Sequence, residues 1–377
     1  MSRSSRAPRA LCRTTIARSS SDLPSSCAPG RRSLVMVGRS ERESILRGIR
    51  GAKRLQRDLR LDVGASRAQR VDVFGCIARS GATLMFQPLE PLLGAFIREE
   101  GVAGIILSTR RPLGMQRFTA AHELGHLVLG HDPHADDEGI LRRAPWASDG
   151  ARAPRVPPEE READAFASYF LLPPYLIKEQ MELRGWEPHH FTHPETVYQA
   201  SLRFGTSYRA TVFALEREHV IGRSLGQQLR SAEPRDLKRQ LLGDYVLKNA
   251  QRVDVWHLTE QDEGAVIEAS RDDLFLLRLK EDSGSGYVWT FDELRDAGFA
   301  ILRDGREPVP EGQIGSPTVR RVLVHAERPL AGLLTLREIR PWAPNDDPQL
   351  LTLYCKTATS DEAGLFEPQR EELLAAS

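Results

Sequence analysis

Apolar residues in the first two thirds of the chain recur at intervals typical of helices and of short strands. Thr119 stands where it could cap one of the helices, and two prolines after Leu172 end another. This mixture of elements predicts a small α+β domain. The expected helices lie at 41–63, 71–78, 118–130, 159–172 and within 194–222, and the expected strands lie at 82–89 and 101–109.

Beyond residue 245 the pattern changes to short strand-like runs that are separated by turn residues. About seven such runs are typical of an all-β antiparallel sandwich. We therefore expect two folded domains at 41–230 and 245–360, joined by a linker at 231–244. Residues 1–40 are expected to be a disordered leader or the result of a misassigned start, and residues 361–377 a disordered tail.

The composition excludes some classes of protein and leaves the expected two-domain organisation unchanged. The 377 residues carry 52 basic and 52 acidic side chains. No apolar run approaches the ~20 residues of a membrane-spanning helix, so no membrane association is expected. Basic residues gather before residue 70, which a leader and a solvated helix explain, and direct nucleic-acid binding is not expected. The 4 cysteines lie far apart, which favours a reducing, cytoplasmic setting.

Residues 122–126 read HELGH, an HExxH motif within a predicted helix. Side chains four residues apart share one face of a helix, so His122 and His126 can both reach a single Zn²⁺ ion. Glu123 would lie beside the metal rather than on it, where a carboxylate serves as general base for an attacking water. His131 follows the motif and is expected to be a loop residue off the ligand face.

A catalytic zinc site needs a third protein ligand, and the helix expected at 159–172 supplies acidic candidates. Glu160 and Asp164 share a face, so one can bind the metal while the other accepts the spare N–H of a ligand histidine. Glu162 is the alternative ligand, but it lies about 200° around the helix from Glu160. We prefer Glu160 because it alone pairs with Asp164 in this way.

Two segments carry these residues, RFTAAHELGHLVLGH and EREADAFASYFLLPP. Both resemble the ImmA/IrrE metallopeptidases, whose pattern is an AHExxH helix followed by an E-x-x-A-[ND]-x-FA-x-x-LL-x-P helix. The resemblance covers residues 41–225 and implies a gluzincin-like fold, with His122, His126 and Glu160 as zinc ligands and Glu123 as general base. It also implies that the physiological substrate is a helix-turn-helix transcriptional repressor.

Three pieces of the C-terminal region, at 283–289, 312–316 and 340–342, resemble the chagasin-like inhibitors of cysteine proteases. That family is an immunoglobulin-like sandwich with three loops at one end, although the first loop here lacks the family's Asn-Pro-Thr-Thr and the middle loop its double glycine. Trp289 is expected in the core, whereas Trp342 fits either an exposed wedge or a core position with a stacked arginine. The resemblance implies a papain-like cysteine protease as partner and these inhibitor-type loop residues: Gly286, Tyr287, Arg340, Pro341 and Trp342.

Three hypotheses of function follow. The first is a zinc endopeptidase that cleaves a specific regulatory protein, and the second is a binding or inhibitor protein that acts through the sandwich, with a regulatory or idle metallopeptidase domain. The third is a sensor with a structural zinc ion. A structural site has no use for a general base, so Glu123 favours the first. The residue that stabilises the oxyanion is left open among Tyr169, His189, His190 and His193.

Overall fold

The structure, a computed structural model, describes most of the chain between residues 41 and 358. The predicted leader at 1–40, the predicted tail at 361–377 and the loop at 312–316 lie outside the described residues. The described residues are 41–63, 69–90, 92–99, 101–136, 156–247, 253–307, 318–343 and 348–358.

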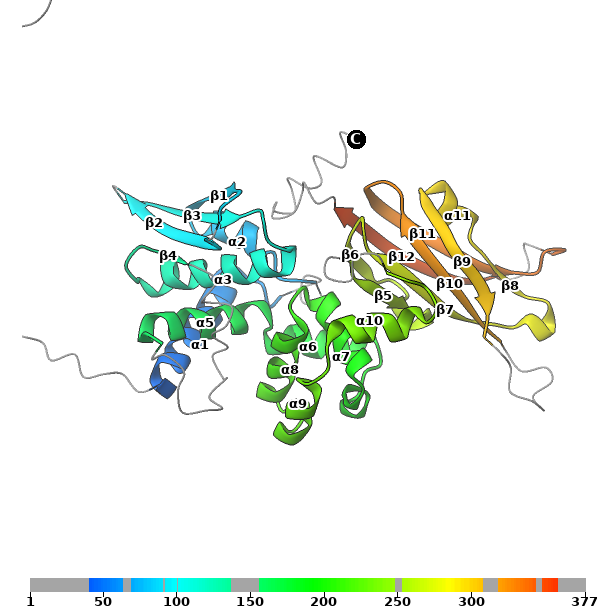
Figure 1. The fold of residues 1–377 in the computed structure, drawn as a ribbon, viewed down its shortest axis with the longest axis horizontal. Coiled ribbons are helices and arrows are strands. Elements are labelled where there is room, and N and C mark those ends of the chain that lie inside the picture. Colours follow the sequence, from blue (N-terminus) through cyan, green and yellow to red (C-terminus); the bar gives the residue numbers. More distant parts are fainter. Residues whose placement is uncertain are drawn as a thin grey trace, which may run out of the picture. The chain divides into compact units, whose positions relative to one another are not determined.

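A mixed sheet packs against helices in the part of the fold that follows residue 40 (Figure 1). The strand order is β1-β3-β2-β4, in which β1 and β3 are parallel and the other neighbours are antiparallel. Phe96 and Ile105 of the sheet share a buried cluster with Phe74 and Phe166 of the helices. The elements are α1 (Glu41–Asp58), α2 (Val73–Arg79), β1 (Ala82–Gln87), β2 (Gly94–Glu99), β3 (Val102–Ser108), α3 (Leu113–Leu129), β4 (His134–Asp136) and α5 (Pro158–Leu171).

Helix α1 lies directly against α5, and small residues make this close approach feasible. A Cβ atom at Gly48 would overlap with the main-chain oxygen of Glu162 in α5. The contact places the amphipathic first helix over the helix that carries the acidic candidates. The expected helix at 41–63 is confirmed over most of its length, and strand β2 is an element that the sequence pattern did not reveal.

A series of short helices continues the chain after α5. Pro158, Pro174, Pro194 and Pro234 each open a helix, a position where the missing N–H of proline removes no helical hydrogen bond. The last of these helices lies within 231–244, the segment predicted as a linker. The elements are α6 (Pro174–Leu183), η2 (Pro188–Thr192), α7 (Pro194–Phe204), α8 (Tyr208–Arg217), α9 (Arg223–Leu229) and α10 (Pro234–Leu242).

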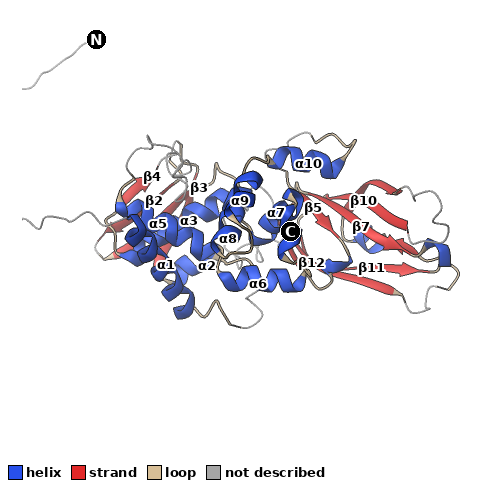
Figure 2. Cartoon of the chain, turned by 90° about the horizontal axis from the view of Figure 1, so that it is seen from below, coloured by secondary structure: helices blue, strands red, loops and turns tan. Residues whose placement is uncertain are grey.

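The strands that follow form two four-stranded sheets, as the all-β expectation required (Figure 2). Their orders are β5-β7-β10-β9 and β6-β12-β11-β8, and most neighbouring strands are antiparallel. The pairs β5–β7 and β6–β12 are parallel, so the expectation of an antiparallel sandwich holds for the other neighbouring strands but not for these two pairs. The elements are β5 (Val255–Leu258), η3 (Glu260–Asp262), β6 (Val266–Ser270), β7 (Leu274–Glu281), η4 (Ser283–Ser285), β8 (Val288–Thr290), α11 (Asp292–Asp296), β9 (Phe299–Arg306), β10 (Thr318–Ala326), β11 (Leu330–Ile339) and β12 (Gln349–Ala358).

Aromatic residues fill the interior of the sandwich. Trp289 is 3 % exposed, and its indole N–H donates a hydrogen bond to the carbonyl of Lys280 over 2.7 Å, which confirms its predicted core position.

The predicted fold class, an α+β domain followed by an all-β sandwich, is confirmed by these elements and sheets. Within the described part of the chain, no helix combines the length and apolar character that crossing a bilayer requires.

Candidate metal centre

The HExxH motif lies in α3, whose two ends are fixed by its flanking residues. The carbonyl of Pro112 accepts the first helical hydrogen bond, from Gln116 N–H over 3.0 Å. The helix ends at Gly130, which adopts the left-handed conformation with φ 73°. Thr119 therefore lies inside the helix and is buried, and the expectation that it caps the helix was wrong because the helix begins at Leu113, directly after Pro112.

Two histidines of α3 and one glutamate of α5 bring their polar atoms together. His122 Nε2 lies 3.0 Å from His126 Nε2. The Glu160 carboxylate oxygens lie 3.5 Å from the first of these nitrogens and 3.8 Å from the second. Both histidines are buried, whereas Glu160 remains 15 % exposed. Among the described residues, this cluster has the composition and spacing to hold a metal ion.

The separations and the donor types both fit a zinc ion. Nitrogen and oxygen atoms that surround zinc tetrahedrally at 2.0–2.2 Å are about 3.3–3.6 Å from one another. The observed separations, from 3.0 to 3.8 Å, lie close to these values. Two imidazoles and one carboxylate are also the ligand set of catalytic zinc sites, which keep the fourth position for water or substrate. The cluster is thus suited to a catalytic rather than a closed structural site.

The acidic residues of α5 divide between two directions, as their helical spacing predicted. Asp164 Oδ1 lies 2.9 Å from His122 Nδ1, so this carboxylate can hold the ring with Nε2 toward the metal position. Glu162 does not join the cluster, because its Oε2 atom contacts His131 Nε2 at 3.0 Å and also pairs with Arg47. The geometry therefore supports Glu160 over Glu162 as the third ligand.

Glu123 follows His122 on α3 and has no solvent-exposed surface. Its carboxylate lies against strand β2, where a Cβ atom at Gly94 would be 3.2 Å from Glu123 Oε1. Gly94 thus leaves room for the carboxylate between the helix and the sheet. The predicted general base is held on the sheet side of the helix that carries the ligands.

His131 is a residue whose role the sequence pattern missed. It is only 6 % exposed, and its Nδ1 atom lies 3.0 Å from Nδ1 of the ligand candidate His126. Burial lowers the pKa of His131, although the Glu162 carboxylate opposes this effect. The expectation of a loop residue was correct for the backbone, but the left-handed turn at Gly130 folds the imidazole back under α3. A glycine directly before the histidine was the only sequence signal.

The contacts that the structure describes for the candidate oxyanion donors are with residues outside the cluster. Tyr169 is covered by Lys53 and Arg217, whose cationic groups lie 5.1 and 4.9 Å from the ring centroid. His189 is exposed, and His190 Nδ1 accepts a hydrogen bond from the main chain of Glu187. His193 lines a separate cavity described below. The oxyanion donor therefore stays unassigned.

Two of the three predicted inhibitor-type loops meet at one end of the sandwich. Trp342 is 72 % exposed and packs on Gly286, where a Cβ atom would overlap with the indole. Arg340 lies over the ring of Tyr287 at 4.4 Å from its centroid, and Arg340 Nε donates to the carbonyl of Ser285. Of the two interpretations of Trp342, the exposed one is observed, and the arginine stacks on tyrosine instead. Pro341 is also exposed.

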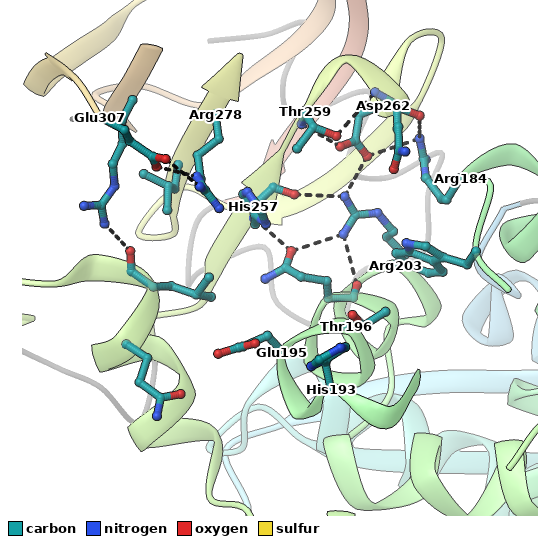
Figure 3. A pocket seen from close by; sticks show the side chains of 17 residues that line it. Arg184, His193, Glu195, Thr196, Arg203, His257, Thr259, Asp262, Arg278 and Glu307 are labelled. Carbon is teal, nitrogen blue, oxygen red and sulfur yellow. Dashed lines mark hydrogen bonds and ion pairs between the residues drawn. The ribbon is translucent and has the colours of Figure 1, made fainter. Parts of the chain in front are cut away.

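A cavity of about 510 Å³ lies between α7, α10 and the strands of the sandwich, away from the metal cluster (Figure 3). Its polar groups largely bind one another. Asp262 accepts from Arg203 over 2.6 Å and pairs with Arg184 at 3.1 Å, while Gln199 accepts from the main-chain N–H of His257 over 2.8 Å. These contacts join the helices to the first strand of the sandwich. They do not form a second metal cluster among the described residues.

A His-His-Glu cluster on two packed helices, with a further glutamate beside it, is the arrangement of a metallopeptidase-like domain. The family comparison is more specific. Residues 77–216 match the family model described as the IrrE N-terminal-like domain, which is a peptidase family. The match includes α3 and α5, and with them every ligand candidate.

A separate part of the chain is similar to small inhibitor proteins. Amoebiasin-2 of Entamoeba histolytica is 28 % identical over 93 residues, which cover 24 % of this chain and 75 % of that protein. The crystal structure of the cysteine protease inhibitor EhICP2 from the same organism is 21 % identical to this chain. The match covers 28 % of this chain and 97 % of the inhibitor chain, with a TM-score of 0.23. The solution structure of amebosin is 22 % identical to this chain, and the match covers 28 % of this chain and 98 % of amebosin. Its TM-score is 0.24.

Proposed function

We propose that the protein is a zinc-dependent endopeptidase that cleaves a specific regulatory protein, namely a helix-turn-helix transcriptional repressor. The observation that carries the proposal is the grouping of His122, His126 and Glu160, whose ligand atoms lie within 4.8 Å of one another. The match of residues 77–216 supports the peptidase chemistry, and the resemblance to the ImmA/IrrE metallopeptidases supports the substrate class. Free thiols at Cys76 and Cys355 support a cytoplasmic location.

The side chains of the cluster have distinct tasks in this reaction. Zinc, when bound, polarises water and the substrate carbonyl. Glu123 accepts a proton from the attacking water on a carboxylate oxygen and passes it to the leaving amine. Asp164 holds His122 so that its Nε2 atom stays directed toward the metal position. Glu160 remains 15 % exposed, so we expect water and a peptide to reach the site from its side.

The experiment compares the wild-type chain with Glu123→Gln, using a helix-turn-helix protein encoded next to it as substrate. The variant should keep one zinc ion per chain, measured by mass spectrometry, and lose at least about 100-fold in cleavage rate. Glu182→Gln, an exposed glutamate on α6, is the matched control and should cleave at the wild-type rate. Zinc-free wild-type protein, or undiminished cleavage by the Glu123 variant, would contradict the proposal.

We infer as a second function that the sandwich binds a papain-like cysteine protease. The observation that favours it is the exposed Trp342 next to the Gly286–Tyr287 loop. The full chain should inhibit papain, and Trp342→Ala should weaken the inhibition at least about tenfold, as expected for an aromatic anchor. Leu333→Ala, which changes a similarly exposed apolar residue on β11, is the control. If papain is fully active at micromolar concentrations of the chain, the sandwich has no such role.

A further inference from the structure

A row of four side chains connects helix α1 to one ligand of the candidate metal centre. His126 Nδ1 lies 3.0 Å from His131 Nδ1, and His131 Nε2 lies 3.0 Å from Glu162 Oε2. Arg47 Nη1 donates to the same carboxylate oxygen. The row runs from α3 through the turn after Gly130 to α5 and α1, so it joins three helices.

These contacts are all satisfied by one arrangement of protons when His126 binds metal. A neutral imidazole that binds metal through Nε2 carries its proton on Nδ1, so His126 must donate to His131 Nδ1. The proton of a neutral His131 then lies on Nε2, from which it donates to Glu162. Arg47 places a positive charge beside this buried carboxylate.

We propose that His131, Glu162 and Arg47 are positioning residues that fix the tautomer and orientation of His126 for metal binding. The inference rests on the proposed metal centre and adds to it. His122 is held directly by Asp164, whereas His126 is held through a second histidine. Both ligand histidines thereby have the ring nitrogen opposite the metal position fixed by a neighbour, which is how proteins raise the affinity of histidine sites.

Burial argues that the row serves the metal centre as well as helix packing. Glu162 is completely buried and His131 is 6 % exposed, so each needs a polar partner inside the protein. If the row served only to pack the helices together, apolar side chains of similar volume could replace it, often without loss of folding stability. Arg47 Nη2 also donates to the carbonyl of Leu129 over 3.1 Å, which ties the end of α3 to α1.

The test compares two isosteric substitutions, His131→Leu and His131→Asn, in the full chain. Asparagine keeps an acceptor near the position of Nδ1, whereas leucine removes it. The affinity for Co²⁺, measured by competition with a chelator, should fall 10–100-fold in the leucine variant and less than about threefold in the asparagine variant. The visible spectrum of bound Co²⁺, which reports its ligands, should change only with leucine.

Two further variants separate positioning from folding. Glu162→Gln keeps an oxygen for His131 but removes the charge, and its affinity for Co²⁺ should fall about tenfold, so it tests the inference even if the leucine variant does not fold. Leu55→Ala weakens the packing of α1 without touching the row and should leave the affinity unchanged. Wild-type affinity in both His131→Leu and Glu162→Gln overturns the inference while the peptidase proposal stands. Failure of wild-type protein to bind Co²⁺ overturns both.

Discussion

His257 makes the stability of the protein depend on pH. It lies on β5 and lines the cavity of Figure 3, and its Nε2 atom is buried without a hydrogen-bond partner among the described residues. Burial lowers the pKa of this imidazole from 6.5 to about 4, and the nearby Arg278 adds to the effect. Protonation of His257 is therefore disfavoured in the folded protein but not in the unfolded chain.

The sign of the effect follows from which state gains the proton. Between pH 6.5 and pH 4 only the unfolded chain becomes protonated at His257, so the free energy of unfolding falls as the pH falls. A pKa lower by about 2.5 corresponds to a loss of about 3 kcal/mol, of which about 2 kcal/mol is lost by about pH 5. Below about pH 4 both states are protonated, and the loss stops growing.

Urea unfolding followed by tryptophan fluorescence measures this loss, because the neighbouring Trp256 is buried. Glutamine cannot be protonated, so His257→Gln should lose about 3 kcal/mol less stability than wild type between about pH 7 and pH 4. His189→Gln replaces an exposed histidine and should follow the wild-type curve. The reasoning is refuted if wild type and His257→Gln lose stability in parallel.

Three more measurements test the centre and the helices around it. Asp164→Ala removes the partner of His122 Nδ1 and should weaken zinc binding 10–100-fold in a chelator competition, whereas unchanged affinity would contradict the assigned role. Gly48→Ala places a Cβ atom on the Glu162 carbonyl and should lower the free energy of unfolding in urea by about 1–3 kcal/mol; a neutral effect would show that α1 can shift away. Removal of zinc should lower the melting temperature of wild type, and adding zinc at 100 times its dissociation constant should restore about 2.7 kcal/mol.

The core of the metal centre was predictable because helical spacing is a local property. His122 and His126 had to share a face once their segment was helical, and the same rule placed Glu160 with Asp164 and turned Glu162 away. The contacts at 2.9–3.8 Å agree with that expectation. Only the packing of the two helices against each other had to be assumed.

Two features of the structure, the position of His131 and strand β2, could not be predicted from the sequence pattern. His131 reaches the centre because Gly130 takes a left-handed conformation, and no periodicity reports where a side chain lies after such a turn. Strand β2 was missed because it carries exposed charges at its end, Arg98 and Glu99, and lacks a regular alternation. The place of β2 in the sheet is set by its tertiary contacts with β3 and β4 rather than by local preference.

The parallel strand pairs have a related cause. β6 belongs to the opposite sheet from β5 and β7, so β5 and β7 are neighbours in their own sheet without being joined by a hairpin. These two strands pair side by side in parallel. The turns alone predict reversals, but they do not tell which sheet each strand joins.

Helix α1 packs against the helix that carries Glu160, although α1 lies before residues 77–216, the range that matches the family model. Arg47 pairs with the buried Glu162 carboxylate, and Gly48 lets α1 approach α5. A chain without α1 would lack both this cation and the helix that covers the Glu162 side of α5. Because Glu162 and the ligand candidate Glu160 lie on the same turn of α5, the structural unit that supports the candidate ligands is larger than the segment that matches the family model.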